Sequence, residues 1–223
     1  MNSVNVKQQS GFTLVEIAIV LVIISLLLGG VLKGTELIEN SKVRRSVNDI
    51  NGVAAAYNAY VDRYRAIPGD DGNRAALQAR GGLWTDVPSA GNSNGRLEVN
   101  RNQVFNAQGE HDEFWEHLKA AGFISGDPKD TSVSALPKNA FGGMIGVTTQ
   151  VVNSSLAGLK VCLSQVPGKA AMALDNQMDD GDGAKGVMRA TPGNNNGAAT
   201  NPNNTELPAP YSEDSTYTVC MRI

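Results

Sequence analysis

The stretch QQSGFTLVEIAIVLVIISLLLGG, residues 8–30, decides how this chain is organised. From Phe12 to Leu32 the sequence is almost wholly apolar, and Glu16 is its only charged residue. In a helix that rises about 1.5 Å per residue, a segment of this length spans about 30 Å, the thickness of the hydrocarbon core of a bilayer. The stretch therefore predicts one membrane-spanning helix.

The polar leader, residues 1–11, comes before the apolar segment. A general secretory signal has a shorter apolar core with a small-residue cleavage site after it. Nothing like A-x-A follows Leu32. Cleavage is therefore expected at the end of the leader, where it leaves the apolar helix on the protein.

Glu16 is unusual because an ionised side chain inside a bilayer is costly and normally has a partner. If the chain is cut after Gly11, Phe12 carries a new ammonium group, and Glu16 follows four residues later on the same helix face. The helix macrodipole also favours a carboxylate near the N-terminus. In an array of identical chains, Glu16 could instead meet the ammonium of a neighbouring chain. Cleavage would thus create the partner that makes the carboxylate tolerable.

The sequence GFTLVE at residues 11–16, followed by the unbroken apolar segment, resembles the prepilin motif of type IV pilins and type II secretion pseudopilins. The resemblance implies that a prepilin peptidase cuts between Gly11 and Phe12 on the cytoplasmic side and N-methylates Phe12. It also implies that Glu16 aids docking of the subunit into a growing filament. The alternative is a plain signal-anchor helix with a stray glutamate near its edge.

The resemblance further implies an α+β pilin fold, in which a long N-terminal helix packs on a small antiparallel sheet. We expect a leader at 1–11, a transmembrane and filament-core helix at 12–32, its amphipathic continuation at 33–66 and an extracytoplasmic head at 67–223.

Past Leu32 the apolar run becomes an amphipathic pattern. Apolar residues recur in steps of four and three and predict one helix face over three heptads, formed by Val43, Val47, Ile50, Ala54, Tyr57, Val61 and Tyr64. Pro68 and Gly69 end the pattern, so one continuous helix from Phe12 to about Ala66 is expected. A coiled-coil dimer is the alternative explanation of this stripe, but it accounts for neither the leader nor Glu16.

The remaining sequence predicts a small head of mixed structure. Residues 67–102 are loop-like, while 110–122 and 170–180 are typical of short helices, the first capped by Gly122. Four strands are expected, at 143–152, 159–163, 186–190 and 216–223. His111 and His117 lie six residues apart, which does not suit a metal site on one helix face, so surface or packing roles are expected.

Cys162 and Cys220 are the only cysteines. Such a pair fits either an extracytoplasmic disulfide or two unrelated buried thiols, and the membrane segment upstream favours the disulfide. A bridge to the C-terminal strand would resemble the disulfide-closed C-terminal region of many pilins.

Four aspartates cluster with glycines at the end of the second short helix: Asp175, Asp179, Asp180 and Asp182. Closely spaced carboxylates can bind calcium through their oxygen atoms, but the spacing does not match an EF-hand loop. A solvated acidic helix end and turn explains the same residues. The structural explanation is favoured, so no cofactor is expected, and calcium binding is the alternative.

Composition and motifs favour a structural role. The net charge of −3 and the lack of a dense basic patch in the sequence speak against direct nucleic-acid binding. No convincing triad, phosphate loop, zinc set or dinucleotide fingerprint occurs in the sequence, so catalysis is not expected. A pilus subunit is favoured, a type II secretion pseudopilin is the alternative, and the leader and Glu16 disfavour a membrane-anchored ligand-binding or enzymatic domain.

By resemblance, the partners are identical or related pilin subunits, the prepilin peptidase, an inner-membrane assembly platform and the membrane itself. The chain is expected to span the bacterial inner membrane once, with its N-terminus in the cytoplasm, before it joins an extracellular pilus or a periplasmic pseudopilus. Basic residues are more numerous after the apolar segment than before it, which by charge alone predicts the opposite orientation. Because long domains can translocate despite such charges, the motif decides the expected orientation.

Overall fold

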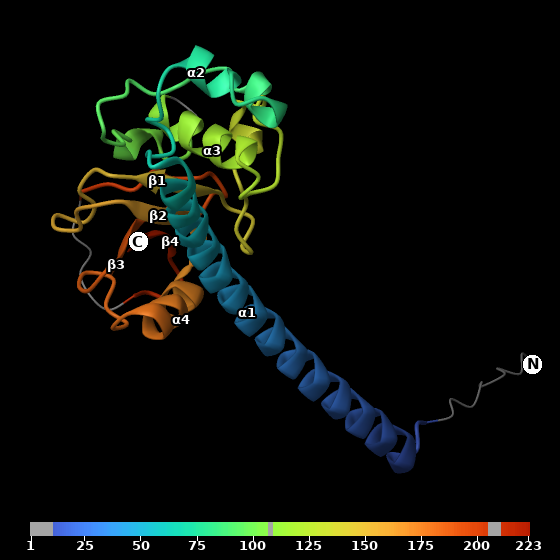
Figure 1. The fold of residues 1–223 in the computed structure, drawn as a ribbon. Coiled ribbons are helices and arrows are strands. Elements are labelled where there is room, and N and C mark those ends of the chain that lie inside the picture. Colours follow the sequence, from blue (N-terminus) through green and yellow to red (C-terminus); the bar gives the residue numbers. More distant parts are fainter. Residues whose placement is uncertain (1–10, 107–108, 205–210) are drawn as a thin grey trace, which may run out of the picture. The chain divides into compact units, whose positions relative to one another are not determined.

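The computed structural model describes residues 11–106, 109–204 and 211–223 (Figure 1). Its first element, α1, is one unbroken helix of 51 residues, Leu14–Tyr64. Within the described residues, α1 is the one helix long and apolar enough to span a membrane. The chain divides into two compact units, one ending at Ser41 and the other running from Lys42 to Ile223, so α1 contributes to both.

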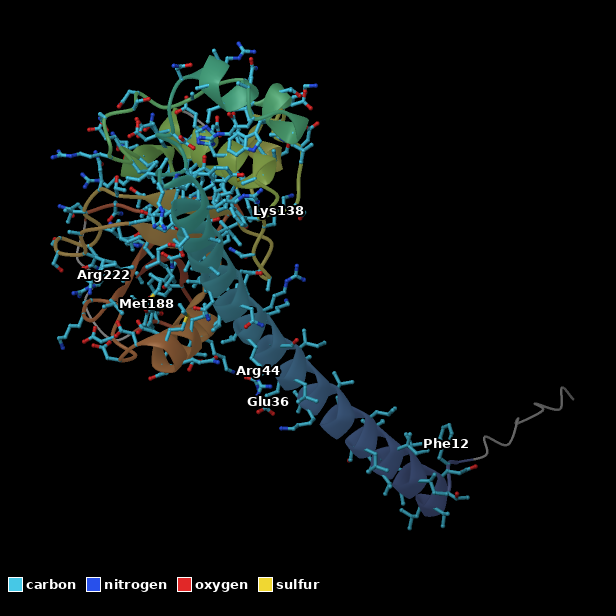
Figure 2. All side chains as sticks on the ribbon, viewed as in Figure 1. Phe12, Glu36, Arg44, Lys138, Met188 and Arg222 are labelled. Atoms are coloured by element: carbon cyan, nitrogen blue, oxygen red, sulfur yellow. A yellow bond between two sulfur atoms is a disulfide. The ribbon has the colours of Figure 1, made fainter. Side chains whose placement is uncertain are left out.

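The part of α1 before Ser41 exposes apolar side chains on all sides. Every large apolar side chain from Phe12 to Ile38 is exposed, and that of Leu14 is 91% exposed. These side chains surround the helix, with Phe12 near its start (Figure 2). So much contiguous apolar surface is unfavourable in water, so lipid or other apolar helices must cover it.

The second half of α1 packs within the head through a face that differs from the predicted stripe. Its buried residues are Val43, Ser46, Ile50, Val53, Ala56 and Tyr60. Only Val43 and Ile50 of the predicted stripe are fully buried, and its other members are half-buried. The face is shifted because aromatic rings from outside α1 gather around Tyr60, namely those of Trp84, His117 and Phe123.

The head contains a four-stranded antiparallel sheet with the strand order β1-β2-β4-β3. The strands are β1 Ile145–Thr148, β2 Lys160–Pro167, β3 Met188–Pro192 and β4 Thr216–Arg222. Each overlaps one predicted strand, and most of their side chains are buried. The predicted α+β architecture, a long N-terminal helix with a small antiparallel sheet, is confirmed (Figure 1).

Short helices complete the head. The two that were expected are α3, Glu110–Ala120, which contacts β1, and α4, Gly168–Met178, which contacts β2, β3 and β4. Gly122 ends α3 with φ at +75°, so that Phe123 N–H donates to Leu118 C=O at 3.0 Å. The segment 67–102, predicted as loop, contains α2 Arg74–Gln78 and the 3-10 turn Gly82–Asp86, and further 3-10 turns lie at Arg101–Gln103 and Val133–Ala135.

The predicted disulfide joins Cys162 and Cys220, which face each other across β2 and β4. The two residues are 58 positions apart. The bridge therefore lowers the conformational entropy of the unfolded chain, which stabilises the folded head by about 4 kcal/mol.

We expect Cys162→Ser combined with Cys220→Ser to lower the free energy of unfolding by about that amount in urea titrations followed by tryptophan fluorescence. Reduction of the wild-type protein should reproduce the loss, and equal stability of mutant and wild type would contradict it.

Candidate processing and assembly site

The predicted processing site lies just before α1 begins. Gly11 and Phe12 are exposed and non-helical. A Cβ built on Gly11 would meet no atom within 4 Å. The peptide bond between the two residues is therefore not shielded by the described part of the chain, and cleavage there stays a prediction.

Thr13 and Glu16 form a capping box at the first turn of α1. The backbone N–H and the hydroxyl of Thr13 both donate to Glu16 Oε2 at 2.8 Å, and the Glu16 N–H donates to Thr13 Oγ1 at 3.3 Å. The first N–H groups of a helix lack partners within it, so these bonds stabilise the turn. This role of Thr13 was not predicted, although the T-x-x-E spacing is its signature.

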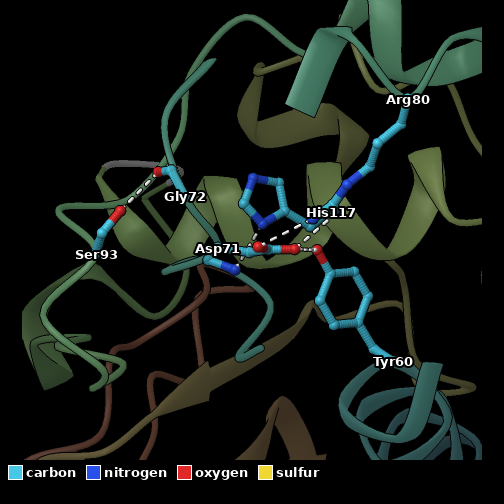
Figure 3. A network of polar contacts seen from close by, with 7 residues as sticks. Tyr60, Asp71, Gly72, Arg80, Ser93 and His117 are labelled. Carbon is cyan, nitrogen blue, oxygen red and sulfur yellow. Dashed lines mark hydrogen bonds and ion pairs between the residues drawn. The ribbon is translucent and has the colours of Figure 1, made fainter. Parts of the chain in front are cut away.

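A buried polar network lies at the C-terminal end of α1 (Figure 3). Tyr60 donates its hydroxyl proton to Asp71 Oδ2 at 2.6 Å, and the Arg80 fork donates to both Asp71 oxygens at 2.7 and 3.1 Å. The Arg80 guanidinium also lies 4.6 Å from the ring centre of Tyr64 and 4.7 Å from that of Trp84. Asp71 thereby links the loop after α1 both to Tyr60 in α1 and to Arg80, two residues past the end of α2.

Burial, reinforced by the Asp71 carboxylate, raises the pKa of Tyr60 above its ordinary value. The hydroxyl therefore stays protonated and keeps donating at neutral pH. This network was not predicted, because Tyr60, Asp71 and Arg80 come from three separate segments and form no local pattern.

Both histidines are buried, so the predicted surface role is wrong and the packing role is right. His117 Nδ1 accepts from the Gly69 N–H at 2.9 Å, and His111 Nε2 accepts from Trp115 Nε1 at 3.3 Å. Burial lowers the pKa of each histidine to about 4. Both rings are therefore neutral at physiological pH and serve as acceptors in the head interior.

Three of the four calcium candidates lie together. Oxygen atoms of Asp175, Asp179 and Asp180 lie within 4.8 Å of one another, whereas Asp182 lies outside this group and pairs with Lys185 at 2.8 Å.

Two of the clustered carboxylates are already held by hydrogen bonds. Asp175 accepts from Tyr211 Oη at 2.5 Å and from the Gly181 N–H at 3.0 Å, and Asp179 accepts from the Met188 N–H at 2.8 Å. Burial raises the pKa of Asp175. These bonds account for part of the cluster as turn structure, and calcium binding stays a prediction.

The N-terminal end of the chain is similar to a known protein family. Residues 6–32 match the family model of the prokaryotic N-terminal methylation motif, which is the prepilin signature of type IV pilins and pseudopilins. The match covers the expected cleavage site and the apolar segment, and it does not extend into the head. No curated protein matches the chain.

Proposed function

We propose that this chain, which carries the prepilin signature at residues 6–32, is a structural subunit of a type IV pilus or pilus-like filament. The observation that carries the proposal is the apolar surface of α1 before Ser41, which is exposed on all sides and directly follows the expected cleavage site within the matched motif. Lipid and other apolar helices are the two environments that can cover such a surface. A filament subunit meets both in turn.

Maturation starts in the inner membrane. The segment 12–32 spans the bilayer once, with the leader in the cytoplasm and the head on the other side. A prepilin peptidase removes the leader and methylates Phe12. An assembly platform then moves the subunit from lipid into a bundle of identical or related helices, where apolar surfaces pack against each other.

Glu16 connects processing to assembly in this scheme. The capping box holds its carboxylate at the N-terminal end of α1, beside the residue that becomes the new terminus. The new ammonium at Phe12, in the same or a neighbouring subunit, can then compensate a charge that would be costly inside an apolar bundle. The helix macrodipole favours the same placement.

We expect Glu16→Ala to leave leader removal intact and to reduce filament yield at least tenfold, because the new ammonium loses its counter-ion in an apolar core. Mass spectrometry of the membrane fraction reports processing, and the amount of sheared filament reports assembly. Glu36→Ala is the matched control, since Glu36 is an exposed glutamate of α1 beyond the segment 12–32. Wild-type filament yield in Glu16→Ala would remove the role assigned to Glu16.

A type II secretion pseudopilin is the second candidate, since it shares the N-terminal signature. The size of the head and the Asn-rich sequence of residues 191–210 favour a surface-exposed pilus. Shearing intact cells separates the two functions. Recovery of the chain in long surface filaments supports the pilus, and its confinement to the periplasm supports the pseudopilus.

The proposal assigns the head a structural rather than a catalytic role. The proposal includes no cofactor, and calcium binding by the cluster of Asp175, Asp179 and Asp180 is the alternative. Isothermal titration of the purified protein with calcium chloride tests it directly.

A further inference from the structure

A groove in the head contains a carboxylate oxygen without a partner. The groove has a volume of about 260 Å³ and lies between α1 and the segments around α3 and β1, where its main lining residues are Asp49, Gly52, Val53, Trp115, Ile124 and Ile145. Asp49 Oδ2 is buried and has no hydrogen-bond partner among the described residues. Since most of this lining is apolar, the groove itself offers the carboxylate little compensation.

Asp49 as a whole is half-buried, but its buried and unpaired Oδ2 atom is unfavourable for the isolated head. Burial raises the pKa of Asp49, and the nearby Arg45 opposes that rise without donating to Oδ2. The head thus keeps a group that costs it stability. A donor supplied from outside would remove this cost.

The size and lining of the groove favour a basic side chain as its occupant. Its volume lies below the roughly 300–1,000 Å³ typical of small-molecule sites. Arginine and lysine combine an apolar stem, which suits Val53 and Ile124, with a cation for Asp49. Gly52 lines the groove and has no side chain to occupy it, and a Cβ built there would meet no atom within 4 Å.

The same helix offers a matching basic segment, Lys42 to Arg45. Its basic residues Lys42, Arg44 and Arg45 are exposed, and Arg44 projects outward from α1 (Figure 2). These residues precede Asp49 by four to seven positions, or about 6–10 Å along a helix axis. Two parallel copies of α1 displaced by that distance would bring the basic segment of one copy beside Asp49 of the other.

We propose that the Asp49 groove receives a basic side chain from residues 42–45 of a second copy of this chain. The inference rests on the proposed function, in which parallel copies of α1 pack side by side. It extends that function by naming a contact beyond the apolar segment, one that fixes the axial offset between neighbouring subunits.

Two variants test the groove in the full-length, processed protein. Asp49→Asn removes the charge, and Gly52→Leu places a larger side chain in the groove at a position where a Cβ meets no atom within 4 Å. Each should reduce sheared filament yield at least tenfold while leader removal is unchanged and the thermal midpoint of the detergent-solubilised subunit is not lowered. Asp62→Asn, at an exposed aspartate of the same helix, should assemble like wild type. Wild-type filament yield in both groove variants overturns the proposal.

Cross-linking identifies the occupant. Two differently tagged chains are co-expressed, one with Asn48→Cys at the rim of the groove and the other with Arg44→Cys. A disulfide-linked heterodimer in sheared filaments is expected, whereas Arg63→Cys in place of Arg44→Cys should give none. Assembly defects in the groove variants without the 44–48 cross-link would show that another molecule fills the groove, which overturns the assignment to a second copy.

The outcome separates this inference from the proposed function. If the wild-type chain forms no filament under any condition, the proposed function fails. If it forms filaments that tolerate Asp49→Asn and Gly52→Leu, the groove has no part in assembly and the filament role stands.

Discussion

Gly11→Val is expected to abolish leader removal and, with it, filament assembly. Gly11 precedes α1 in exposed, non-helical chain, and a Cβ there meets no atom within 4 Å. Valine therefore costs the described chain nothing in packing. Cleavage is expected to be lost because the motif that the prepilin peptidase recognises has glycine before the cut. Intact mass and N-terminal sequencing of the membrane fraction measure it, and the variant should retain Met1.

Gly29→Ala is the matched control for that experiment. Gly29 also has open space around its Cα, but it lies within α1 and away from the cut. It should be processed like wild type. Normal cleavage of Gly11→Val would contradict the assignment of residues 11 and 12 as the processing site.

Asp71→Ala is expected to lower the free energy of unfolding of the head by about 3–5 kcal/mol, because it leaves the Arg80 guanidinium and the Tyr60 hydroxyl without their common acceptor. The Asp71 side chain is only 8% exposed, so water replaces these bonds poorly. Urea titration of the processed protein in detergent, followed by tryptophan fluorescence, measures the change, and Trp84 beside Arg80 makes the signal local.

Two further variants calibrate this result. Asp86→Ala removes an ion pair with Lys129 whose lysine is largely exposed, and it should cost roughly 0–1 kcal/mol. Tyr60→Phe keeps the Asp71–Arg80 pair and removes one hydrogen bond, so it should cost about 1 kcal/mol. If Asp71→Ala were no more harmful than Asp86→Ala, the network would not hold the loop to α1.

The sequence predicted those parts of the fold that rest on local patterns. The helix expected from Phe12 to about Ala66 runs from Leu14 to Tyr64, and the four strands lie at or next to their expected positions. Local composition is sufficient there, because a long apolar run and short alternating runs between turn residues each favour one secondary structure.

The features that were missed depend on contacts between distant segments. The buried face of α1 is centred on Val53 and Tyr60 rather than on Ala54 and Val61. Which side of an amphipathic helix is buried depends on the residues of the head that pack against it. The Tyr60–Asp71–Arg80 network and the Asp49 groove likewise join segments that are separate in sequence. The Thr13–Glu16 capping box is different, since its spacing was available in the sequence and was overlooked.

The strand order also means that the sheet cannot be completed before the last strand of the chain is available. β4 follows the other strands along the chain, yet it lies between β2 and β3, and β3 pairs with β4 alone. If the head crosses the membrane as proposed, β3 has no strand beside it and Cys162 has no partner to oxidise with until residues 216–222 have crossed. A chain stalled in translocation before that point would lack the central strand of its sheet and the disulfide, and these two features would distinguish it from a fully exported subunit.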